Sequence, residues 1–294
     1  MVRKIGLLSA VARGARFVLN RTGFHSRSVP TAIGTLHAYD ARGTGTLPTI
    51  VLLHGLGSAA TSFGPLLTRM RPHARRLVAL DLPGHGFSQA PSHRLTPQAL
   101  FEAVCEALDV LVDEPMILVG GSLGGALALR YAIERPQRLV GLALLSPAAA
   151  RTSPGEWEDL RDTFKIESAA EARLLLARLY HRPPWYLPAL AAGVRDVLQG
   201  AAVRDVVGTA TLEDLPAAHD LPALAMPILL LWGQSERLLP PSSLAYFRQH
   251  LPAHAVIEEP VGFGHCPHFD DPARLALRLI AFARTATATT VAAA

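Results

Sequence analysis

Residues 116–125 read MILVGGSLGG, and this stretch decides the fold of the chain. The apolar residues 116–120 predict a buried strand, and residues 123–134 predict a helix. Between them, Gly120-Gly121-Ser122-Leu123-Gly124 fits the pattern G-x-S-x-G, in which a serine occupies a strained turn between strand and helix. Small residues must flank that serine because a larger side chain would strike the strand or the helix. The context favours Ser122 as a nucleophile; the alternative is a glycine-rich turn that only allows close packing.

Apolar runs alternate with helical stretches on both sides of this motif. Strands are expected at residues 49–54, 76–81, 116–120, 139–146, 227–233 and 255–261, and helices at 62–70, 96–113, 123–134, 242–250 and 272–283. Strands that are apolar on both faces and alternate with helices are typical of a mainly parallel sheet covered by helices on both sides. The predicted fold class is therefore α/β.

Three segments fall outside this alternation. Residues 1–28 are basic and amphipathic, residues 151–222 contain helical patches without a convincing strand, and residues 285–294 (TATATTVAAA) are low in complexity. We expect residues 29–150 and 223–284 to form the core, residues 151–222 a helical cap, and the last ten a flexible tail. Five cap aromatics are expected to form the cap's own core, with a subset lining an apolar pocket: Trp157, Phe164, Tyr180, Trp185 and Tyr186.

The composition excludes several classes of protein. Of the 294 residues, 50% are hydrophobic and 18% are charged, which rules out a disordered, collagen-like or coiled-coil chain. The apolar runs are too short to span a bilayer. Only Cys105 and Cys266 are present, so a disulfide framework or zinc knuckle is not available and the cytoplasm is the expected compartment.

The net charge of +4 arises at the N-terminus. Six arginines and lysines precede the first acidic residue, Asp40, and without them the net charge would be −2, so we expect no nucleic-acid partner. On a helix, residues 5, 8, 11, 12, 15, 18 and 19 share one face, and Arg3, Arg13 and Arg16 lie off it. Residues 3–19 therefore predict a helix packed on the body or an interfacial membrane helix, with a cleaved signal peptide as a third alternative. The oligomeric state is not predicted.

A nucleophilic serine needs a base, and the base needs an orienting acid. His265, in GFGH (262–265), follows the last expected strand, and Glu236, in WGQSE (232–236), follows the strand before it. Both would lie at the carboxyl edge of the sheet beside Ser122. The backbone N–H groups of Leu56, in HGLG (54–57), and Leu123 are the candidate donors to an oxyanion. His54 is expected to be structural, with its ring bonded to loop backbone.

The loop that carries His265 also contains Cys266 and His268, which could be drawn as metal ligands. Three ligands within four residues, without an evident fourth, make a poor zinc geometry, so we expect no metal site. Cys266 is expected to act as a small apolar residue beside the base. Asp270 and Asp271, a few residues later, are expected to cap the last helix.

Five motifs together resemble the α/β-hydrolase superfamily, and they occur in that family's order over about residues 30–284. They are HGLG (54–57), DLPGHGFS (81–88), GGSLGG (120–125), WGQSERLLP (232–240) and GFGHCPHFDDP (262–272). The resemblance implies an eight-stranded sheet, a helical cap after the sixth strand, no cofactor, and a structural role for the loop at residues 81–86. Two positions depart from the family pattern: Glu236 stands where aspartate is more usual, and Gly121 stands where many relatives have a larger residue.

The residues and the resemblance together predict a serine hydrolase that cleaves a carboxylic ester of a lipophilic small molecule through an acyl-enzyme. Ser122 would attack, His265 would carry the proton, and Glu236 would hold the imidazole, while the N–H groups of Leu56 and Leu123 bind the oxyanion. The alternatives are a C–C bond hydrolase or an acyltransferase with the same residues, and a non-catalytic ligand-binding or accessory protein. We expect a cytoplasmic protein, with membrane association through residues 3–19 as the alternative.

Overall fold

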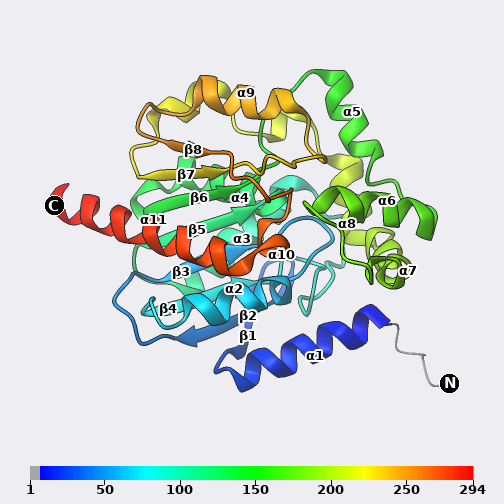
Figure 1. Ribbon diagram of the computed structural model, residues 1–294, viewed down its shortest axis with the longest axis horizontal. Helices are drawn as coiled ribbons and strands as arrows, with labels where there is room; N and C mark the ends of the chain where they lie inside the picture. The colour runs from blue at the N-terminus through cyan, green and yellow to red at the C-terminus, as the bar shows by residue number, and fades with distance from the viewer. Residues whose placement is uncertain (1–6, 294) are drawn as a thin grey trace.

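The computed structural model describes residues 7–293, and the side chains of residues 7–289, as an α/β fold built on one sheet (Figure 1). The strands are β1 (His25–Thr31), β2 (Gly34–Arg42), β3 (Ile50–Leu53), β4 (Arg76–Leu80), β5 (Met116–Gly121), β6 (Leu139–Leu145), β7 (Ile228–Leu231) and β8 (Val256–Glu258). Their order in the sheet is β1-β2-β4-β3-β5-β6-β7-β8. Strand β2 runs antiparallel to β1 and to β4, and all other neighbours are parallel. The predicted eight-stranded, mainly parallel sheet is confirmed.

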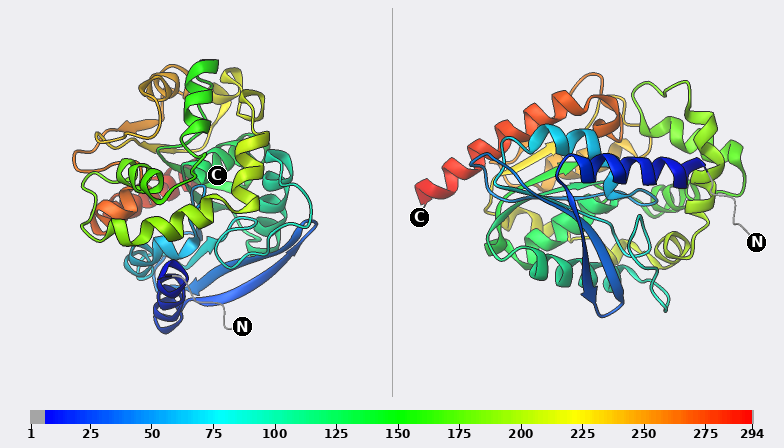
Figure 2. Two further views of the ribbon diagram at one scale, coloured as in Figure 1. Left: turned by 90° about the vertical axis from the view of Figure 1, so that its right-hand side faces the viewer. Right: turned by 90° about the horizontal axis from the view of Figure 1, so that it is seen from below.

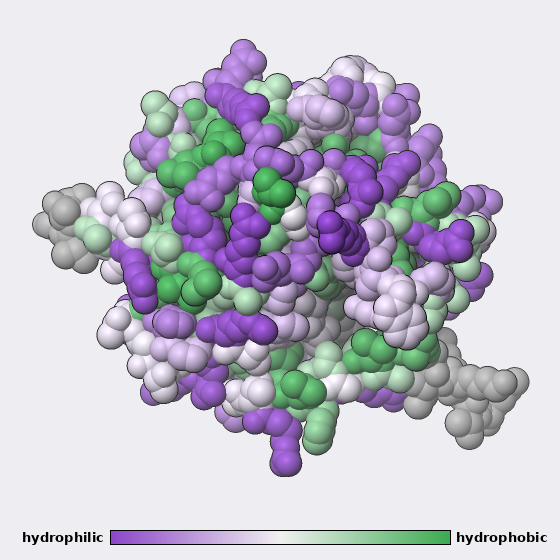
Figure 3. All heavy atoms as spheres, viewed as in Figure 1, coloured by the Kyte–Doolittle hydropathy of each residue, from purple (hydrophilic) through white to green (hydrophobic). Residues whose placement is uncertain are grey.

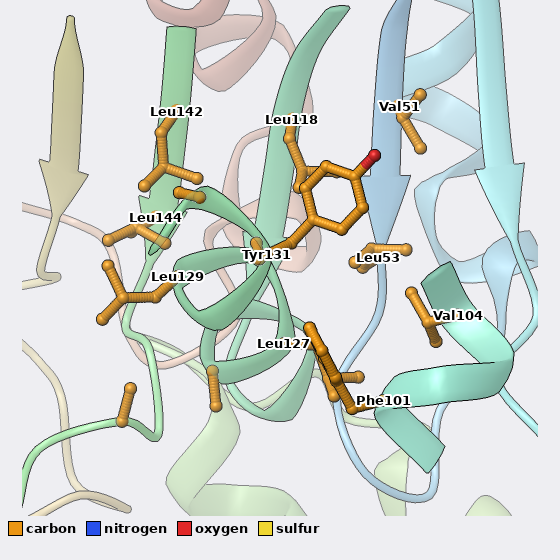
Figure 4. Packing of buried hydrophobic residues seen from close by; sticks show 14 of the residues in the cluster. Val51, Leu53, Phe101, Val104, Leu118, Leu127, Leu129, Tyr131, Leu142 and Leu144 are labelled. Atoms are coloured by element: carbon orange, nitrogen blue, oxygen red, sulfur yellow. The ribbon is translucent and has the colours of Figure 1, made fainter. Parts of the chain in front are cut away.

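Helices cover both faces of the sheet. One face carries α2 (Gly64–Met70) and α11 (Pro272–Ala293), and the other carries α3 (Pro97–Leu111), α4 (Leu123–Glu134) and α9 (Pro241–His250). Each central strand contributes alternate side chains to two separate cores. Leu118 of β5, for example, packs with α4, whereas Ile117 and Val119 pack on the opposite side. Figure 4 shows Leu127 and Tyr131 of α4 packed among residues of the sheet. Burial on both faces explains why the central strands are continuous apolar runs in the sequence.

The first two strands were not recognised in the sequence. Strand β1 exposes most of its residues, buries only Val29 and contains Pro30, so it lacks the apolar run that marks the central strands. It pairs only with β2, at the edge of the sheet, and Figure 2 shows this hairpin projecting from the body of the molecule. Because β1 begins at His25, it also starts inside residues 1–28, which were expected to form a basic, amphipathic segment separate from the core.

A helical insertion separates β6 from β7 in the chain. It contains α5 (Pro154–Asp162), α6 (Ala169–Leu179), α7 (Leu187–Leu198), α8 (Ala201–Thr209) and the short 3₁₀ helices η3 (Leu212–Asp214) and η4 (Ala218–Ala223). The structure describes all of residues 151–222 and places no strand there. Helices α5 and α6 each begin with a capping box, Ser153 with Glu156 and Ser168 with Glu171, which satisfies free N–H groups at their first turns. The insertion has its own apolar cluster, which includes Leu175, Leu176, Leu187 and Leu198.

The described part of the chain begins and ends with a helix. Helix α1 (Leu7–Arg21) buries Leu19 and packs near α2 and α7, with Leu8 directly against Gly193 of α7 (Figures 1 and 2). Arg3, Lys4 and Ile5, which the expected helix included, lie outside the described residues. At the other end, residues 285–293 extend α11 instead of forming the expected flexible tail. Alanine is the strongest helix former, and the hydroxyls of Thr285 and Thr287 bond to carbonyls one turn earlier, while Ala286 is buried.

Candidate active site

Ser122 occupies the turn between β5 and α4 with a backbone conformation that is rare for a non-glycine residue. Its φ is 52° and its ψ is −118°, a strained region that needs support from the surrounding structure. Three backbone hydrogen bonds supply that support. The Ser122 N–H donates to Leu145 O at 3.0 Å, and Ser122 O accepts from the N–H groups of Ala126 and Ala148, each at 3.0 Å.

Two glycines allow this turn because other backbone passes very close to them. A Cβ atom on Gly120 would lie 2.2 Å from the carbonyl oxygen of Gly124. A Cβ atom on Gly124 would lie 2.2 Å from the carbonyl oxygen of Leu53, at the end of β3. The requirement for small residues around Ser122 is therefore a requirement for close contact between strand, turn and helix.

His265 and Glu236 form a buried hydrogen-bonded pair. The distance from His265 Nδ1 to Glu236 Oε2 is 2.8 Å, and the two side chains are only 2% and 4% exposed. Glu236 Oε1 accepts hydrogen bonds from the N–H groups of Leu238 at 2.8 Å and Leu239 at 3.1 Å. The glutamate therefore reaches the imidazole with one oxygen and is fixed to its own loop with the other.

The surroundings of Glu236 keep it ionised. Burial alone would raise the pKa of this carboxyl, but the attraction of His265 and the hydrogen bonds from His265 and Leu239 outweigh burial and hold the pKa below its ordinary value. An ionised Glu236 accepts a hydrogen bond from the N–H at His265 Nδ1, and this leaves Nε2 as the unprotonated nitrogen of the ring.

The loop after β3 lies against the Ser122 turn. A Cβ atom on Gly55 would be 3.1 Å from Ser122 Cβ, and the next residue, Leu56, lines the same cavity as Ser122 and Leu123. Within residues 7–293, no hydrogen bond uses the N–H of Leu56. The N–H of Leu123 belongs to the first residue of α4, where no intrahelical acceptor exists. Two backbone donors beside the serine are thus available to a ligand.

His54 holds this loop, as the sequence predicted. Its Nδ1 donates to Gly55 O at 2.8 Å and its Nε2 accepts from the N–H of Leu82 at 3.0 Å. Burial lowers the pKa of His54 to about 4, so the ring is neutral near pH 7. Asp81 in the neighbouring loop is also structural, because its buried carboxylate accepts the N–H groups of Ala60 at 2.7 Å and Phe87 at 3.0 Å.

An apolar cavity opens beside Ser122, between the core and the insertion. Its walls come from the loop after β3, from α4, from the insertion and from the loop that holds Glu236, and they include Leu56, Ser122, Leu123, Trp157, Leu160, Phe164, Val206, Leu238 and Leu239. The expectation for the cap aromatics is right only in part. Trp157 and Phe164 line the cavity and Tyr180 packs on the insertion's core, but Trp185 is 91% exposed and Tyr186 is 48% exposed.

The loop after β8 differs from its prediction at one position. Asp271 caps α11, because Oδ1 accepts the N–H groups of Ala273 at 3.1 Å and Arg274 at 2.9 Å, as expected. Asp270 does not cap the helix. Its carboxylate accepts the N–H of Gly264 in the same loop and the N–H of His181 in the distant insertion. No local sequence signal identifies this role, since it depends on a contact across 89 residues.

The neighbours of His265 are arranged as packing groups. His268 lies with its ring 4.7 Å from that of Phe63 and 4.2 Å from that of Phe269, and burial lowers its pKa to about 3. Burial raises the pKa of the Cys266 thiol far above its ordinary value. Among residues 7–293, no three His, Cys, Asp or Glu side chains are grouped in a way that could hold a metal ion.

Comparison with known proteins agrees with this geometry. A family model described as alpha/beta hydrolase fold matches residues 48–272. A pimeloyl-[acyl-carrier protein] methyl ester esterase of Xanthomonas oryzae pv. oryzae is 31% identical over 249 residues, covering 80% of this chain and 95% of the relative.

Solved structures give the same result. A membrane phospholipase A, described as a bacterial virulence factor, superposes with a TM-score of 0.76 at 25% identity, covering 95% of this chain and 92% of that one. Naproxen esterase of Bacillus subtilis superposes with a TM-score of 0.73 at 20% identity, covering 95% and 99%, which shows a shared fold. Across residues 7–293, none of the helices is both long and apolar enough for a bilayer crossing. The chain therefore belongs to the α/β-hydrolase family, as an enzyme whose named relatives are esterases and hydrolases.

Proposed function

We propose that the protein is a serine esterase that cleaves a carboxylic ester of a lipophilic small molecule through an acyl-enzyme. The observation that carries this proposal is the buried His265–Glu236 pair, with 2.8 Å between Nδ1 and Oε2, at the same edge of the sheet as the strained Ser122 turn. Ser122 is the nucleophile, His265 the general base and acid, and Glu236 the orienting carboxylate.

The reaction follows from these positions. Ser122 Oγ attacks the ester carbonyl carbon and gives its proton to His265 Nε2, while the N–H groups of Leu56 and Leu123 stabilise the oxyanion. His265 then passes the proton to the departing alcohol oxygen, and the C–O bond breaks to leave Ser122 acylated. Water, deprotonated by the same imidazole, hydrolyses the acyl-enzyme and releases the acid. Glu236 balances the charge of the imidazolium in both halves of the reaction.

The cavity favours an apolar acyl or alcohol group. Trp157, Leu160 and Phe164 reach it from the insertion, and Leu238 and Leu239 reach it from the loop of Glu236. Transfer of an apolar group from water to such walls contributes about 25 cal/mol for each Å² buried. We infer that residues 151–222 act as the cap that encloses this group. The relative from Xanthomonas oryzae is named as an esterase for a methyl ester of pimeloyl-[acyl-carrier protein], which supports the ester chemistry of the proposal.

Hydrolysis of p-nitrophenyl esters with acyl chains of graded length tests the proposal. We expect kcat/KM to rise from acetate to a medium chain length, and Trp157→Ala to displace that optimum because it enlarges the cavity. The exposed Trp185, changed to alanine, is the matched control and should leave the optimum in place. A flat profile in the wild-type enzyme would contradict the assignment of the cavity as the acyl or alcohol site, and the absence of any ester hydrolysis would contradict the esterase function.

We also propose that α1 contacts anionic membrane surfaces. Four apolar side chains of this helix are 49–64% exposed: Leu7, Val11, Phe17 and Val18. Arg13, Arg16 and Arg21 lie on the same helix and, within residues 7–293, pair with no carboxylate. Figure 3 shows hydrophobic and hydrophilic residues together along the edge of the molecule that α1 occupies. This combination is typical of helices that lie in a membrane interface.

Sedimentation with phosphatidylglycerol vesicles tests the membrane contact. We expect binding at low salt that falls at high salt, and a loss of about tenfold or more in affinity for the double variant Phe17→Ser, Val18→Ser. Val110→Ser is the control, because Val110 is 60% exposed on α3. Equal binding by the double variant and the control would refute a role for α1, and the esterase assignment would be unaffected.

A further inference from the structure

One carboxylate joins the loop of His265 to the helical insertion. Asp270 Oδ2 accepts the N–H of Gly264 at 2.7 Å, and Gly264 directly precedes His265 in the chain. Asp270 Oδ1 accepts the N–H of His181 at 2.8 Å, in the segment that follows α6. Both oxygens of a single side chain are thus used to hold two segments that are far apart in the sequence.

The segment at residues 177–181, which we name the strap, is bonded to both loops of the His265–Glu236 pair. The N–H of Cys266, next to His265, donates to Leu179 O at 2.9 Å. The guanidinium of Arg237, next to Glu236, donates to Ala177 O at 3.0 Å and also to Tyr180 O. His181 Nδ1 lies 2.7 Å from the hydroxyl oxygen of Ser235.

The strap also lies against the backbone before His265. A Cβ atom on Gly264 would be 2.6 Å from the carbonyl carbon of Tyr180 and 2.7 Å from the nitrogen of His181. The ring of Tyr180 stacks on Phe269, with 5.3 Å between their centroids. The position of the His265 loop is therefore set by direct contact with the strap as well as by hydrogen bonds.

We propose that Asp270 is a positioning residue. It holds the His265 loop where the imidazole meets Glu236, and it ties the position of that loop to the position of the strap. This inference rests on the proposed function of Ser122, His265 and Glu236. Asp270 acts through His265 and does not touch the reacting atoms.

The chemistry of the carboxylate explains why an aspartate is needed. Two backbone N–H groups require two acceptors, and an ionised carboxylate presents two oxygens. An asparagine of the same shape would accept from one N–H and present its own NH₂ group to the other. The loop would then shift, and a displacement of about 1 Å in a catalytic group can reduce the rate about 10²-fold.

The test compares Asp270→Asn with Asp271→Asn. We expect kcat to fall about 10- to 100-fold in Asp270→Asn, with KM within about threefold of wild type. Asp271→Asn should keep kcat within about twofold, because asparagine is as good a helix N-cap as aspartate. Rates are referred to active sites titrated with a fluorophosphonate, so that loss of folded protein does not count as loss of activity.

A second readout separates positioning from a purely structural role. In Asp270→Asn the acid limb of the pH profile of kcat/KM should move by about 0.5 pH unit or more, because the contact between His265 and Glu236 has changed. Arg237→Gln is an independent variant, because it weakens the hydrogen bonds between the strap and the loop that carries Glu236. Its kcat should fall about threefold or more.

Each outcome bears on one proposal only. Wild-type kcat per titrated site and an unmoved pH profile in both Asp270→Asn and Arg237→Gln would overturn the inference. If Asp270→Asn yields no folded protein, Arg237→Gln decides the matter by the same two readouts. Retention of activity by Ser122→Ala would instead overturn the proposed function, whatever the Asp270 variant does.

Discussion

Replacement of Glu236 by glutamine removes one negative charge from beside His265 and leaves the shape of the side chain unchanged. The imidazole becomes positively charged when it takes the proton of Ser122, with Glu236 Oε2 2.8 Å from Nδ1 and the centres of charge about 4 Å apart. At an effective dielectric constant of about 20, two such charges attract by about 4 kcal/mol. Loss of that attraction corresponds to a decrease of about 10³-fold in kcat, within an expected range of about 10² to 10⁴.

Hydrogen bonding adds to this loss. If the glutamine oxygen faces His265, its NH₂ group faces the N–H donors of Leu238 and Leu239, and if the NH₂ group faces His265, the imidazole is driven to the wrong tautomer. The assay is steady-state hydrolysis of a p-nitrophenyl ester at pH 7 to 8, with circular dichroism as the control for folding. A folded Glu236→Gln enzyme with kcat within tenfold of wild type would refute the reasoning, and so would a larger loss in Asp270→Asn than in Glu236→Gln.

Two further predictions concern stability. Gly124→Ala should lower the free energy of unfolding by about 3 kcal/mol or more, because its Cβ would lie 2.2 Å from Leu53 O. Gly155→Ala is the control, because Gly155 on α5 faces open space. Equal denaturation midpoints for the two variants would contradict the prediction. Burial alone would raise the pKa of Asp40, but its hydrogen bonds and its attraction to Arg76 and Arg27 hold that pKa below its ordinary value. Asp40 therefore stabilises the fold above about pH 4, and this stabilisation is lost as the pH falls through the lowered pKa. The difference in Tm between wild type and Asp40→Asn should therefore be largest near neutral pH and shrink as the pH falls through the lowered pKa of Asp40. A difference independent of pH would contradict this linkage.

The central strands and the Ser122 turn could be predicted because their determinants are local. An apolar run such as β5 is buried on both faces, and Gly120 is required by contacts within the same strand–turn–helix unit, whereas Gly124 is also restricted by Leu53 O of the neighbouring strand β3. The edge hairpin β1–β2 could not be predicted in this way. Its strand β1 buries a single residue, so sheet pairing decides its conformation, and the sequence pattern does not.

The positions of Glu236 and His265 were predicted from chain order, whereas the role of Asp270 was not. Each of the first two follows a recognisable strand, and parallel strands deliver their carboxyl ends to one edge of the sheet. Asp270 and Asp271 are adjacent acids before a helix and look equivalent in the sequence, but only Asp271 caps α11. The partner of Asp270, the N–H of His181, comes from the insertion, whose placement over the sheet has no local signal.

Labelling with a fluorophosphonate tests the central claim most directly. The phosphorus of this reagent is attacked most rapidly by a serine whose proton is accepted by a positioned base, so the residue that is labelled first identifies the nucleophile. The intact protein is labelled, digested and analysed by mass spectrometry, with Ser122→Ala in parallel. We predict one label per chain, on the peptide that contains Ser122, and no label in the variant. Labelling of a different residue, or undiminished labelling of Ser122→Ala, would contradict the account.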